Sequence, residues 1–435
     1  MMQTPFYLHD NYLPVHDELT AYDLPVTGVI PPELTGWYLR NGPNPRGASG
    51  HWFSGEGMIH GVRLEQGRAA WYRNRWVRTK SFIEGGELYR PDGSRDLTVS
   101  HANTHVISHA GRTLALVESS LPYEIDRDLR TLGPYDFGGR LVDSMTAHPK
   151  ICPTTGELHF FGYGSLTAPY VNYHRADRSG VLTVNRPIDV PGHTMMHDFQ
   201  LTANFVVFMD LPVVFDRSLA TEGAMPFRWD DSYGARLGVL RRDDPYGAVR
   251  WFSIDPCYVF HALNASDDGD RIVSHVLRYP HLWRGTDESV ATLWRWTIDL
   301  STGSVIEEQC DDRPGEFPRI DDRLAGLDAR FGHITAAADR DNGRPSAIVR
   351  YDLHSAATQA HPFAPGRTPG EAVFVPASDQ PGGDGWLLTY VYDAAGNSSD
   401  LSILDTADLA GKPVATVQLP ARVPYGFHGN WIPEG

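Results

Sequence analysis

The chain has 435 residues, with 54 Asp and Glu against 38 Lys and Arg, which gives a formal net charge of −16. Hydrophobic residues make up 41% and charged residues 21%. This composition excludes disorder and predicts a globular protein with a large core. The acidic balance argues against nucleic-acid binding, because little would neutralise the phosphates.

The cysteines and the N-terminus bear on the compartment. Cys152, Cys257 and Cys310 form no CxxC motif and no disulfide framework, so they predict reduced thiols. The first 19 residues lack the apolar core of a signal peptide, and no run of 18 apolar residues occurs. We therefore expect a cytoplasmic protein.

Short apolar or alternating segments, closed by Gly, Asp, Asn or Pro, recur along the chain. They are rich in Val, Ile, Phe, Tyr, Leu and Trp, and a length of about 5–9 residues is typical of strands. The clearest examples are residues 112–118, 157–163, 204–211, 271–279 and 386–393. The best helix candidate is a short turn near residues 319–331. The sequence thus predicts an all-β fold.

A weak repeat indicates which β fold. Asp299, Asp352 and Asp405 each end a predicted strand and are spaced 53 residues apart twice over. One strand, Asp and turn per repeat of about 50 residues is typical of a β-propeller blade, and the length then allows about seven blades. Chance agreement and a pair of β-sandwiches are the alternatives. No linker separates parts of the chain, so we expect a single domain over residues 1–435, with residues 1–20 as an N-terminal extension.

Four of the 19 histidines stand where a predicted strand meets a turn in an apolar or aromatic setting: His148, His197, His261 and His428. A buried imidazole needs a partner, and a metal ion is one such partner. The spacings of 49, 64 and 167 residues correspond to roughly one, one and three blades. Strands of different blades reach the same axis, so these rings can converge on one ion.

Two local histidine pairs are rival sites. His193 with His197, and His101 with His105, have the i,i+4 spacing of ligands on a helix. Both pairs lie beside sequence of strand character, which argues against a helical site.

Several blocks resemble those of the carotenoid cleavage oxygenase family, whose members cleave double bonds of carotenoids, apocarotenoids and stilbenes. The resemblance runs in order from about residue 20 to the C-terminus, and the order makes it specific. The blocks are residues 40–45 (RNGPNP), 53–58 (FSGEGM), 103–106 (NTHV), 147–150 (AHPK), 196–199 (MHDF), 260–264 (FHALN), 315–319 (GEFPR) and 427–429 (FHG).

The resemblance implies a seven-bladed propeller with a dome of loops and short helices over one end. It further implies a non-haem Fe(II) on the axis, held by His148, His197, His261 and His428. Three glutamates that accept hydrogen bonds from the ligand imidazoles match Glu118, Glu316 and Glu371. Thr104 matches the residue whose methyl group crowds one open iron position.

The implied reaction is the cleavage of a conjugated C=C bond by O2 into two carbonyl products. Stilbene-cleaving relatives carry a Lys directly before the first of the three glutamates, and this chain has Val117 there. The substitution favours an apolar carotenoid or apocarotenoid, with Val117 as the one candidate substrate contact, over a stilbenoid or phenylpropenoid. His105 is a second departure, since relatives often have Asn, and it either perturbs the site or points into the sheet.

Other functions stay open at this point. The same scaffold also serves a retinoid isomerohydrolase that needs no O2, and propellers serve as binding platforms in which the histidines would be structural. The resemblance also raises peripheral membrane contact. Residues 211–229, with Leu219, Met225 and Phe227, are a candidate apolar patch, although a dome loop packed inward explains them equally well. No obligatory protein partner is indicated.

Overall fold

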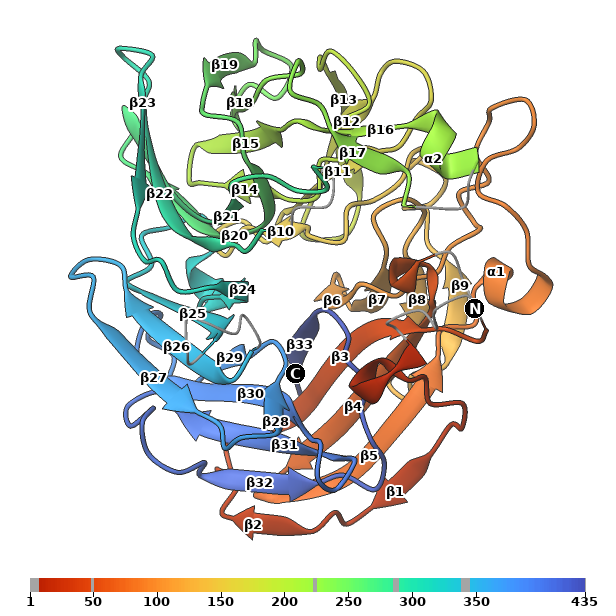
Figure 1. The fold of residues 1–435 in the computed structure, drawn as a ribbon, viewed down its shortest axis with the longest axis vertical. Coiled ribbons are helices and arrows are strands. Elements are labelled where there is room, and N and C mark those ends of the chain that lie inside the picture. Colours follow the sequence, from red (N-terminus) through yellow and green to blue (C-terminus); the bar gives the residue numbers. More distant parts are fainter. Residues whose placement is uncertain (1–7, 48–50, 222–224, 285–288, 338–344, 435) are drawn as a thin grey trace.

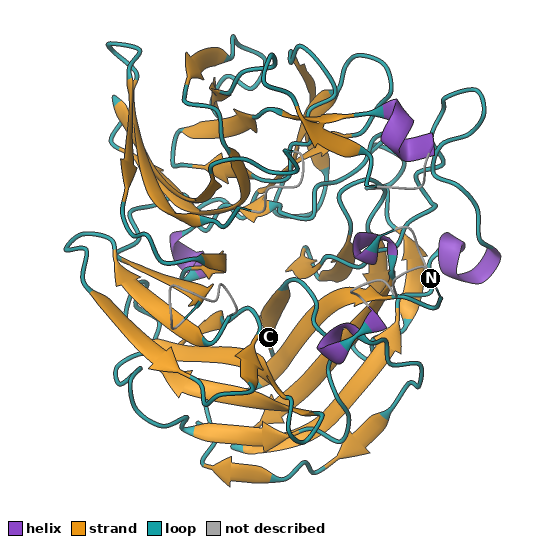
Figure 2. Cartoon of the chain, viewed as in Figure 1, coloured by secondary structure: helices purple, strands orange, loops and turns teal. Residues whose placement is uncertain are grey.

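The computed structural model describes residues 8–47, 51–221, 225–284, 289–337 and 345–434. Within these residues, seven sheets of four to six strands surround one axis, with the strands predominating over a few short helices (Figures 1 and 2). The predicted seven-bladed propeller is thereby confirmed, and the alternative of paired sandwiches is wrong.

Neighbouring strands in each blade are antiparallel, and the blades follow the chain. The first is β6 (His105–His109), β7 (Arg112–Leu116), β8 (Tyr123–Ile125) and β9 (Thr131–Pro134). The second is β10 (Lys150–Ile151), β11 (Leu158–Tyr163), β12 (Val171–Ala176) and β13 (Leu182–Ile188). The third is β14 (Phe199–Leu201), β15 (Phe205–Asp210), β18 (Arg236–Arg241) and β19 (Arg250–Ser253), with an inserted two-stranded sheet of β16 (Val213–Phe215) and β17 (Phe227–Trp229).

The next two blades have the same order. The fourth is β20 (Tyr258–Asp267), β21 (Arg271–Tyr279), β22 (Thr292–Asp299) and β23 (Val305–Gln309). The fifth is β24 (Gly315–Arg319), β25 (Phe331–Ala336), β26 (Ala347–Asp352) and β27 (Thr358–Pro362).

The last two blades join both ends of the chain. The sixth contains β28 (Arg367–Pro369), β29 (Val373–Pro376), β30 (Gly385–Asp393), β31 (Ser398–Asp405) and β32 (Ala415–Gln418), and it gains β2 (Val26–Gly28) at its edge. The seventh pairs the C-terminal β33 (Gly429–Pro433) with β3 (Gly36–Asn44), followed by β4 (Glu56–Glu65), β5 (Arg68–Trp76) and β1 (Thr20–Tyr22). The pairing of β33 with β3 closes the ring.

The aspartate repeat has a physical cause. Asp299, Asp352 and Asp405 end β22, β26 and β31, the equivalent strand in three successive blades. In each case Oδ1 accepts a backbone N–H two residues further on, from Ser301, His354 and Ala407 respectively. An aspartate that caps a turn in this way stabilises the reversal to the next strand.

The core lies between blades. Leu263 and Leu277 of the fourth blade pack in one cluster with Ile334 and Val349 of the fifth. Alternate residues of each strand face a neighbouring sheet, so the buried apolar area holds the blades in fixed positions around the axis.

Helical structure is sparse among the described residues. The short helical turn expected near residues 319–331 is the 3-10 turn η4 (Asp322–Leu324), which follows β24 at Arg319. The remaining pieces are α1 (Lys80–Glu84), α2 (Arg217–Thr221), η2 (Asp10–Tyr12) and η3 (Trp52–Ser54). One-turn helices leave no periodic pattern in a sequence, which explains why they were not predicted.

Two further expectations concern the surface and the thiols. Met225 and Phe227 of the candidate apolar patch are half-buried and pack against the core of blades two to four, while residues 222–224 lie outside the described chain. All three cysteines are free. No helix in the described ranges is long and apolar enough to cross a membrane.

Candidate metal centre

Four imidazoles from four blades meet on the propeller axis. His148 lies two residues before β10, and His197 lies two residues before β14. His261 is within β20, and His428 directly precedes β33. Five of the six ring pairs have centroids 4.5–5.2 Å apart. The structure therefore brings together all four histidines predicted as ligands, across as many as 280 residues of chain (148 to 428).

The spacing of the nitrogen atoms fits a metal ion. The Nε2 atoms of His148 and His197 are 2.9 Å apart, and ligand atoms of His148, His197 and His261 lie within 4.8 Å of one another. Two imidazole nitrogens bound to one ion at about 2.1 Å and at right angles are about 3 Å apart. The buried Nε2 of His261 has no hydrogen-bond partner in the described structure. The described structure thus groups the ligand atoms of three of the four rings, and the fourth ring, that of His428, packs against His148 and His261.

The three predicted glutamates each contact a different ligand ring. The distance from carboxylate oxygen to Nδ1 is 2.6 Å for Glu118 and His197, 2.5 Å for Glu316 and His261, and 2.8 Å for Glu371 and His428. The contacts of His261 and His428 are hydrogen bonds, and a carboxylate only accepts them, so Nδ1 of these two rings carries the proton. Their Nε2 lone pairs are therefore free for a metal ion, which is the role of such carboxylates in metal sites. Glu118 lies close to Nδ1 of His197 without the geometry of a hydrogen bond.

Burial and neighbouring charge set the protonation of the rings. Burial, reinforced by the other imidazoles, holds the pKa of His148 and of His428 well below the usual value. Burial also lowers the pKa of His261, but the carboxylates of Glu316, Asp198 and Glu371 together outweigh it and the net shift is upward. Neutral imidazole is the form that binds a metal.

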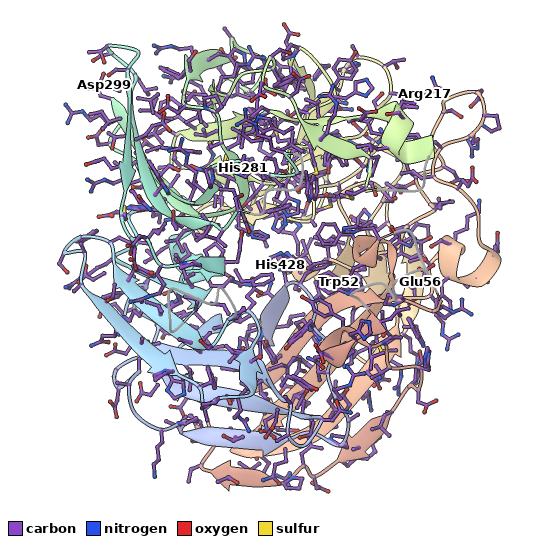
Figure 3. The ribbon with its side chains drawn as sticks, viewed as in Figure 1. Trp52, Glu56, Arg217, His281, Asp299 and His428 are labelled. Atoms are coloured by element: carbon purple, nitrogen blue, oxygen red, sulfur yellow. The ribbon has the colours of Figure 1, made fainter. Side chains whose placement is uncertain are left out.

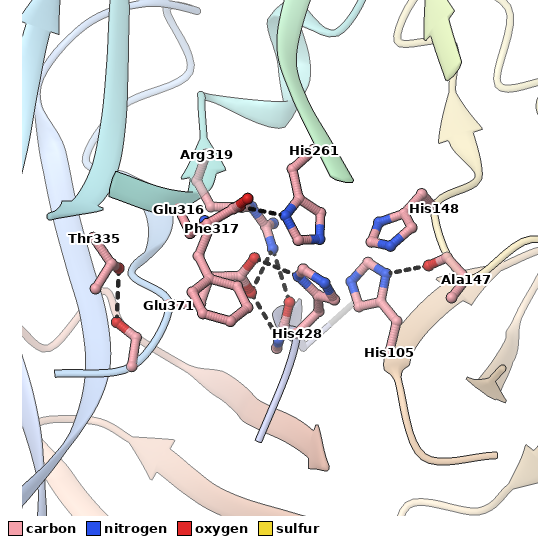
Figure 4. Close-up of polar contacts among 12 residues, drawn as sticks. His105, Ala147, His148, His261, Glu316, Phe317, Arg319, Thr335, Glu371 and His428 are labelled. Atoms are coloured by element: carbon pink, nitrogen blue, oxygen red, sulfur yellow. Dashed lines mark hydrogen bonds and ion pairs between the residues drawn. The ribbon is translucent and has the colours of Figure 1, made fainter. Parts of the chain in front are cut away.

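Asp198 and Arg319 position the ligand segments, and the sequence did not single them out. Asp198 is buried; its Oδ1 lies 2.8 Å from Lys150 Nζ and its Oδ2 accepts the N–H of Ala262 at 2.9 Å. It thereby connects the neighbours of His197 and His261. Arg319 donates to Glu371 Oε2 at 3.3 Å and to the carbonyl of Gly429 at 2.8 Å (Figure 4). Asp198 lies in the sequence block 196–199 and Arg319 in the block 315–319. Their position near His197 and Glu316 in these blocks is the signal that could have identified them.

Phe317 places an aromatic ring on the centre at the cost of backbone strain. Its φ is +56°, where the register of β24 against β25 shifts. Left-handed backbone in a bulky residue costs free energy and is retained where a function needs it. The ring lies 5.7 Å from that of His261 and 5.4 Å from that of His428. It forms an apolar wall beside the two imidazoles.

Thr104 and Val117 have clear places in the structure. The buried Thr104 accepts the N–H of His428 on its carbonyl at 3.0 Å, and its hydroxyl donates to Asn103. Val117 is buried directly before Glu118. These positions lie next to the centre, and the roles expected from the resemblance stay predictions.

The two local histidine pairs do not form sites. His193 packs its ring on Tyr170 at 4.3 Å, away from its partner His197, which is at the centre. His101 lies 3.5 Å from Glu56, whereas His105 lies beside His428 with ring centroids 5.3 Å apart.

Two cavities adjoin the centre. The first, about 610 Å³, follows the axis and is lined by His148, His261 and His428 together with residues of the blade strands such as Lys150 and Asn430. Charged and apolar side chains both line it.

The second cavity, about 520 Å³, is aromatic. It extends from Phe317 and Glu371 to Tyr12, Trp52 and Phe427. Trp52 packs on Phe427 at 4.8 Å, and Figure 3 shows Trp52 and His428 in the same central region. Such a cavity suits a flat conjugated molecule.

Comparisons with known proteins agree with this geometry. Residues 12–433 match the profile of the family described as retinal pigment epithelial membrane protein (RPE65). The chain is 39% identical to a carotenoid cleavage oxygenase of Mycobacterium tuberculosis, over 98% of this chain and 97% of that protein. It is 34% identical to a carotenoid 9,10(9′,10′)-cleavage dioxygenase of Crocus sativus, covering 98% and 89% of the two chains. The solved lignostilbene dioxygenase of Pseudomonas brassicacearum superposes with a TM-score of 0.90 at 29% identity, over 99% of both chains.

Proposed function

The chain belongs to the RPE65, or carotenoid oxygenase, family, and on this basis we propose that it is an Fe(II)-dependent dioxygenase that cleaves a conjugated C=C bond. The substrate class we favour is a carotenoid or apocarotenoid, which O2 converts to two carbonyl products. The observation that carries the proposal is the cluster of four imidazoles on the axis, three of them in contact with carboxylates.

The donor set supports iron. Imidazole nitrogen suits Fe(II), and four neutral rings leave open positions for small ligands. The carboxylates of Glu118, Glu316 and Glu371 offset the charge of the ion and fix the ring tautomers. His148, His197, His261 and His428 would hold the ferrous ion, which would supply the activation of O2.

The protein contributes position and exclusion of water. We place the substrate in the aromatic cavity, where Phe317 borders both the cavity and the rings of His261 and His428. An apolar polyene gains free energy by leaving water and is held in line with the centre. In our proposal the methyl group of Thr104 narrows the space at the ion, so that small molecules approach from one side.

Residue 117 bears on the choice between the two substrate classes. Val117, in place of a lysine, offers no charged partner for a phenol oxygen, which supports an apolar substrate. The likeness to a lignostilbene dioxygenase keeps a stilbenoid or phenylpropenoid as the second candidate. Aromatic stacking against Trp52 and Phe427 would serve either class.

The test is aerobic turnover by the iron-loaded protein of a panel of apocarotenals, carotenes and stilbenes, with carbonyl products identified by mass. Cleavage with one atom of ¹⁸O in each product supports the dioxygenase. Activity on a retinyl ester that survives strict anoxia would instead establish an isomerohydrolase. Absence of stoichiometric iron and of turnover would favour a binding platform.

A further inference from the structure

A fifth imidazole, that of His105, lies beside the four, and one of its nitrogens has no hydrogen-bond partner among the described residues. His105 begins β6 in the blade between those that carry His428 and His148, and it lines the axial cavity. Its ring centroid lies 5.3 Å from that of His428 and 6.2 Å from that of His148. Its Nδ1 lies 2.8 Å from the carbonyl oxygen of Ala147, the residue before His148 (Figure 4).

The contact with Ala147 fixes the tautomer. A carbonyl oxygen only accepts, so Nδ1 of His105 carries the proton and donates it. In the neutral ring, Nε2 is then an acceptor with a free lone pair. This Nε2 is buried and has no hydrogen-bond partner among the described residues. Leaving a buried acceptor unsatisfied destabilises the fold, so a donor is expected in solution.

Charged donors that line the same cavity have partners of their own. His428 donates through Nδ1 to Glu371. Lys150 is paired with Asp198, and Arg319 with Glu371 and the carbonyl of Gly429. A water molecule from the axial cavity, which His105 shares with His148 and His428, can supply the donor.

His105 lies at the edge of the histidine cluster. Its ring contacts those of His428 and His148 at 5.3 and 6.2 Å, whereas the ligand atoms of His148, His197 and His261 form a group within 4.8 Å of one another that does not include His105. His105 is therefore a neighbour of this group and not a member of it. We propose that His105 is a positioning residue of the centre: through Nε2 it accepts a hydrogen bond from a water molecule held between its ring and the metal ion.

The inference rests on the proposed function, and cobalt gives a readout that does not depend on turnover. Co(II) can replace Fe(II), and its visible absorption reports the number of ligands on the ion. His105→Asn places an amide near the position of Nδ1, so it keeps a donor for Ala147 and removes the acceptor. His105→Gln places an amide oxygen near the position of Nε2, so it keeps the acceptor and removes the donor.

We expect the Asn variant to bind Co(II) about 10-fold more weakly than the wild type and to show a changed visible spectrum, because the water loses its acceptor. The Gln variant should keep the wild-type spectrum. His361→Phe is the matched control, since His361 also bonds a carbonyl, that of Leu409, but from the outer strand β27. The His361→Phe variant should leave both the Co(II) affinity and the visible spectrum unchanged.

The inference is overturned if His105→Asn matches the wild type in both affinity and spectrum, which would make His105 an anchor for Ala147 alone. Circular dichroism and Tm of each variant establish that the comparison is between folded proteins. If the wild type itself binds neither Co(II) nor Fe(II), the proposed function fails first. The two failures are therefore distinguishable.

Discussion

At the scale of single residues, the centre depends on rings that lie in or just before the innermost strands of the blades. His261 is within β20 and contacts Glu316, Phe317 and the other three imidazoles. The strand keeps its place through pairing with β21 and through the core on both sides. The position of the strand therefore does not depend on the His261 side chain, whose contacts are with the centre.

Substitution His261→Ala should abolish stoichiometric iron binding and turnover while the propeller stays folded. One of four nitrogen ligands is lost, whereas the blades are held by apolar burial. Iron content per chain and the far-UV circular dichroism spectrum measure the two effects. An iron-loaded, active variant would refute the role of this ring.

Substitution Glu316→Gln should weaken iron binding by roughly 10–100-fold, because an amide neither fixes the His261 tautomer as firmly nor offsets the ionic charge. Competition with a chelator measures the affinity. Glu308→Gln is the control, since Glu308 is exposed and pairs with Arg295. Equal affinity in the two variants would show that Glu316 has no part in the centre.

The sequence predicted all seven histidine and glutamate positions that meet here, because they lie in blocks whose order is specific to a family. It did not predict Asp198 or the strain at Phe317. A carboxylate that joins two backbone segments cannot be told from a surface carboxylate without the fold. A positive φ at a phenylalanine follows from the bulge in β24, and no residue type marks it in advance.

At the scale of elements, polar clusters join neighbouring blades. Glu157, before β11, lies within 3.4–3.7 Å of Arg242, Arg175 and His159. The His159 imidazole, with Thr155 and Arg175 as further causes, holds the pKa of Glu157 at about 2 against an ordinary 4.5, although burial opposes the shift. The charged form therefore stabilises the fold.

Because the folded-state pKa lies below the unfolded value, this stabilisation is complete above about pH 4.5 and is lost as the pH falls toward 2. Glu157→Gln should reduce stability at pH 7 by about 1–2 kcal/mol, allowing for solvent screening. The difference in Tm between wild type and variant should shrink from pH 7 to pH 3.5. A constant or widening difference would contradict the assignment.

The strands themselves were largely predictable. Residues 271–279 coincide with β21, and residues 386–393 with β30 but for its first residue. Alternation and β-branched composition are local properties, so the sequence carries them directly. The one-turn helices α1 and α2 depend on caps and contacts in loops, and the sequence carries no such periodic signal for them.

At the scale of the molecule, the ring is closed by two strands at opposite ends of the chain. β33 pairs with β3 from Gly36 opposite Pro433 to Arg40 opposite Gly429. His428 directly precedes β33, so closure also places this imidazole in the histidine cluster. We propose that residues 1–435 form one domain, because the last blade is incomplete without both ends.

Gly36→Ala should disturb this closure. A Cβ at Gly36 would lie 2.5 Å from the carbonyl oxygen of Ile432 and 2.7 Å from the Trp431 ring. We expect a loss of about 1–3 kcal/mol in stability and lower iron occupancy, measured by thermal unfolding and metal analysis. Gly47→Ala, where a Cβ meets nothing within 4 Å, is the control. Unchanged Tm and iron content in the Gly36 variant would argue against this coupling.

The most direct test of the account is anomalous diffraction at the iron edge from crystals of protein loaded with Fe(II) under anoxia. The account predicts a single peak bonded to the Nε2 atoms of His148, His197, His261 and His428. A peak elsewhere, or iron-replete crystals with no peak among these four rings, would contradict it.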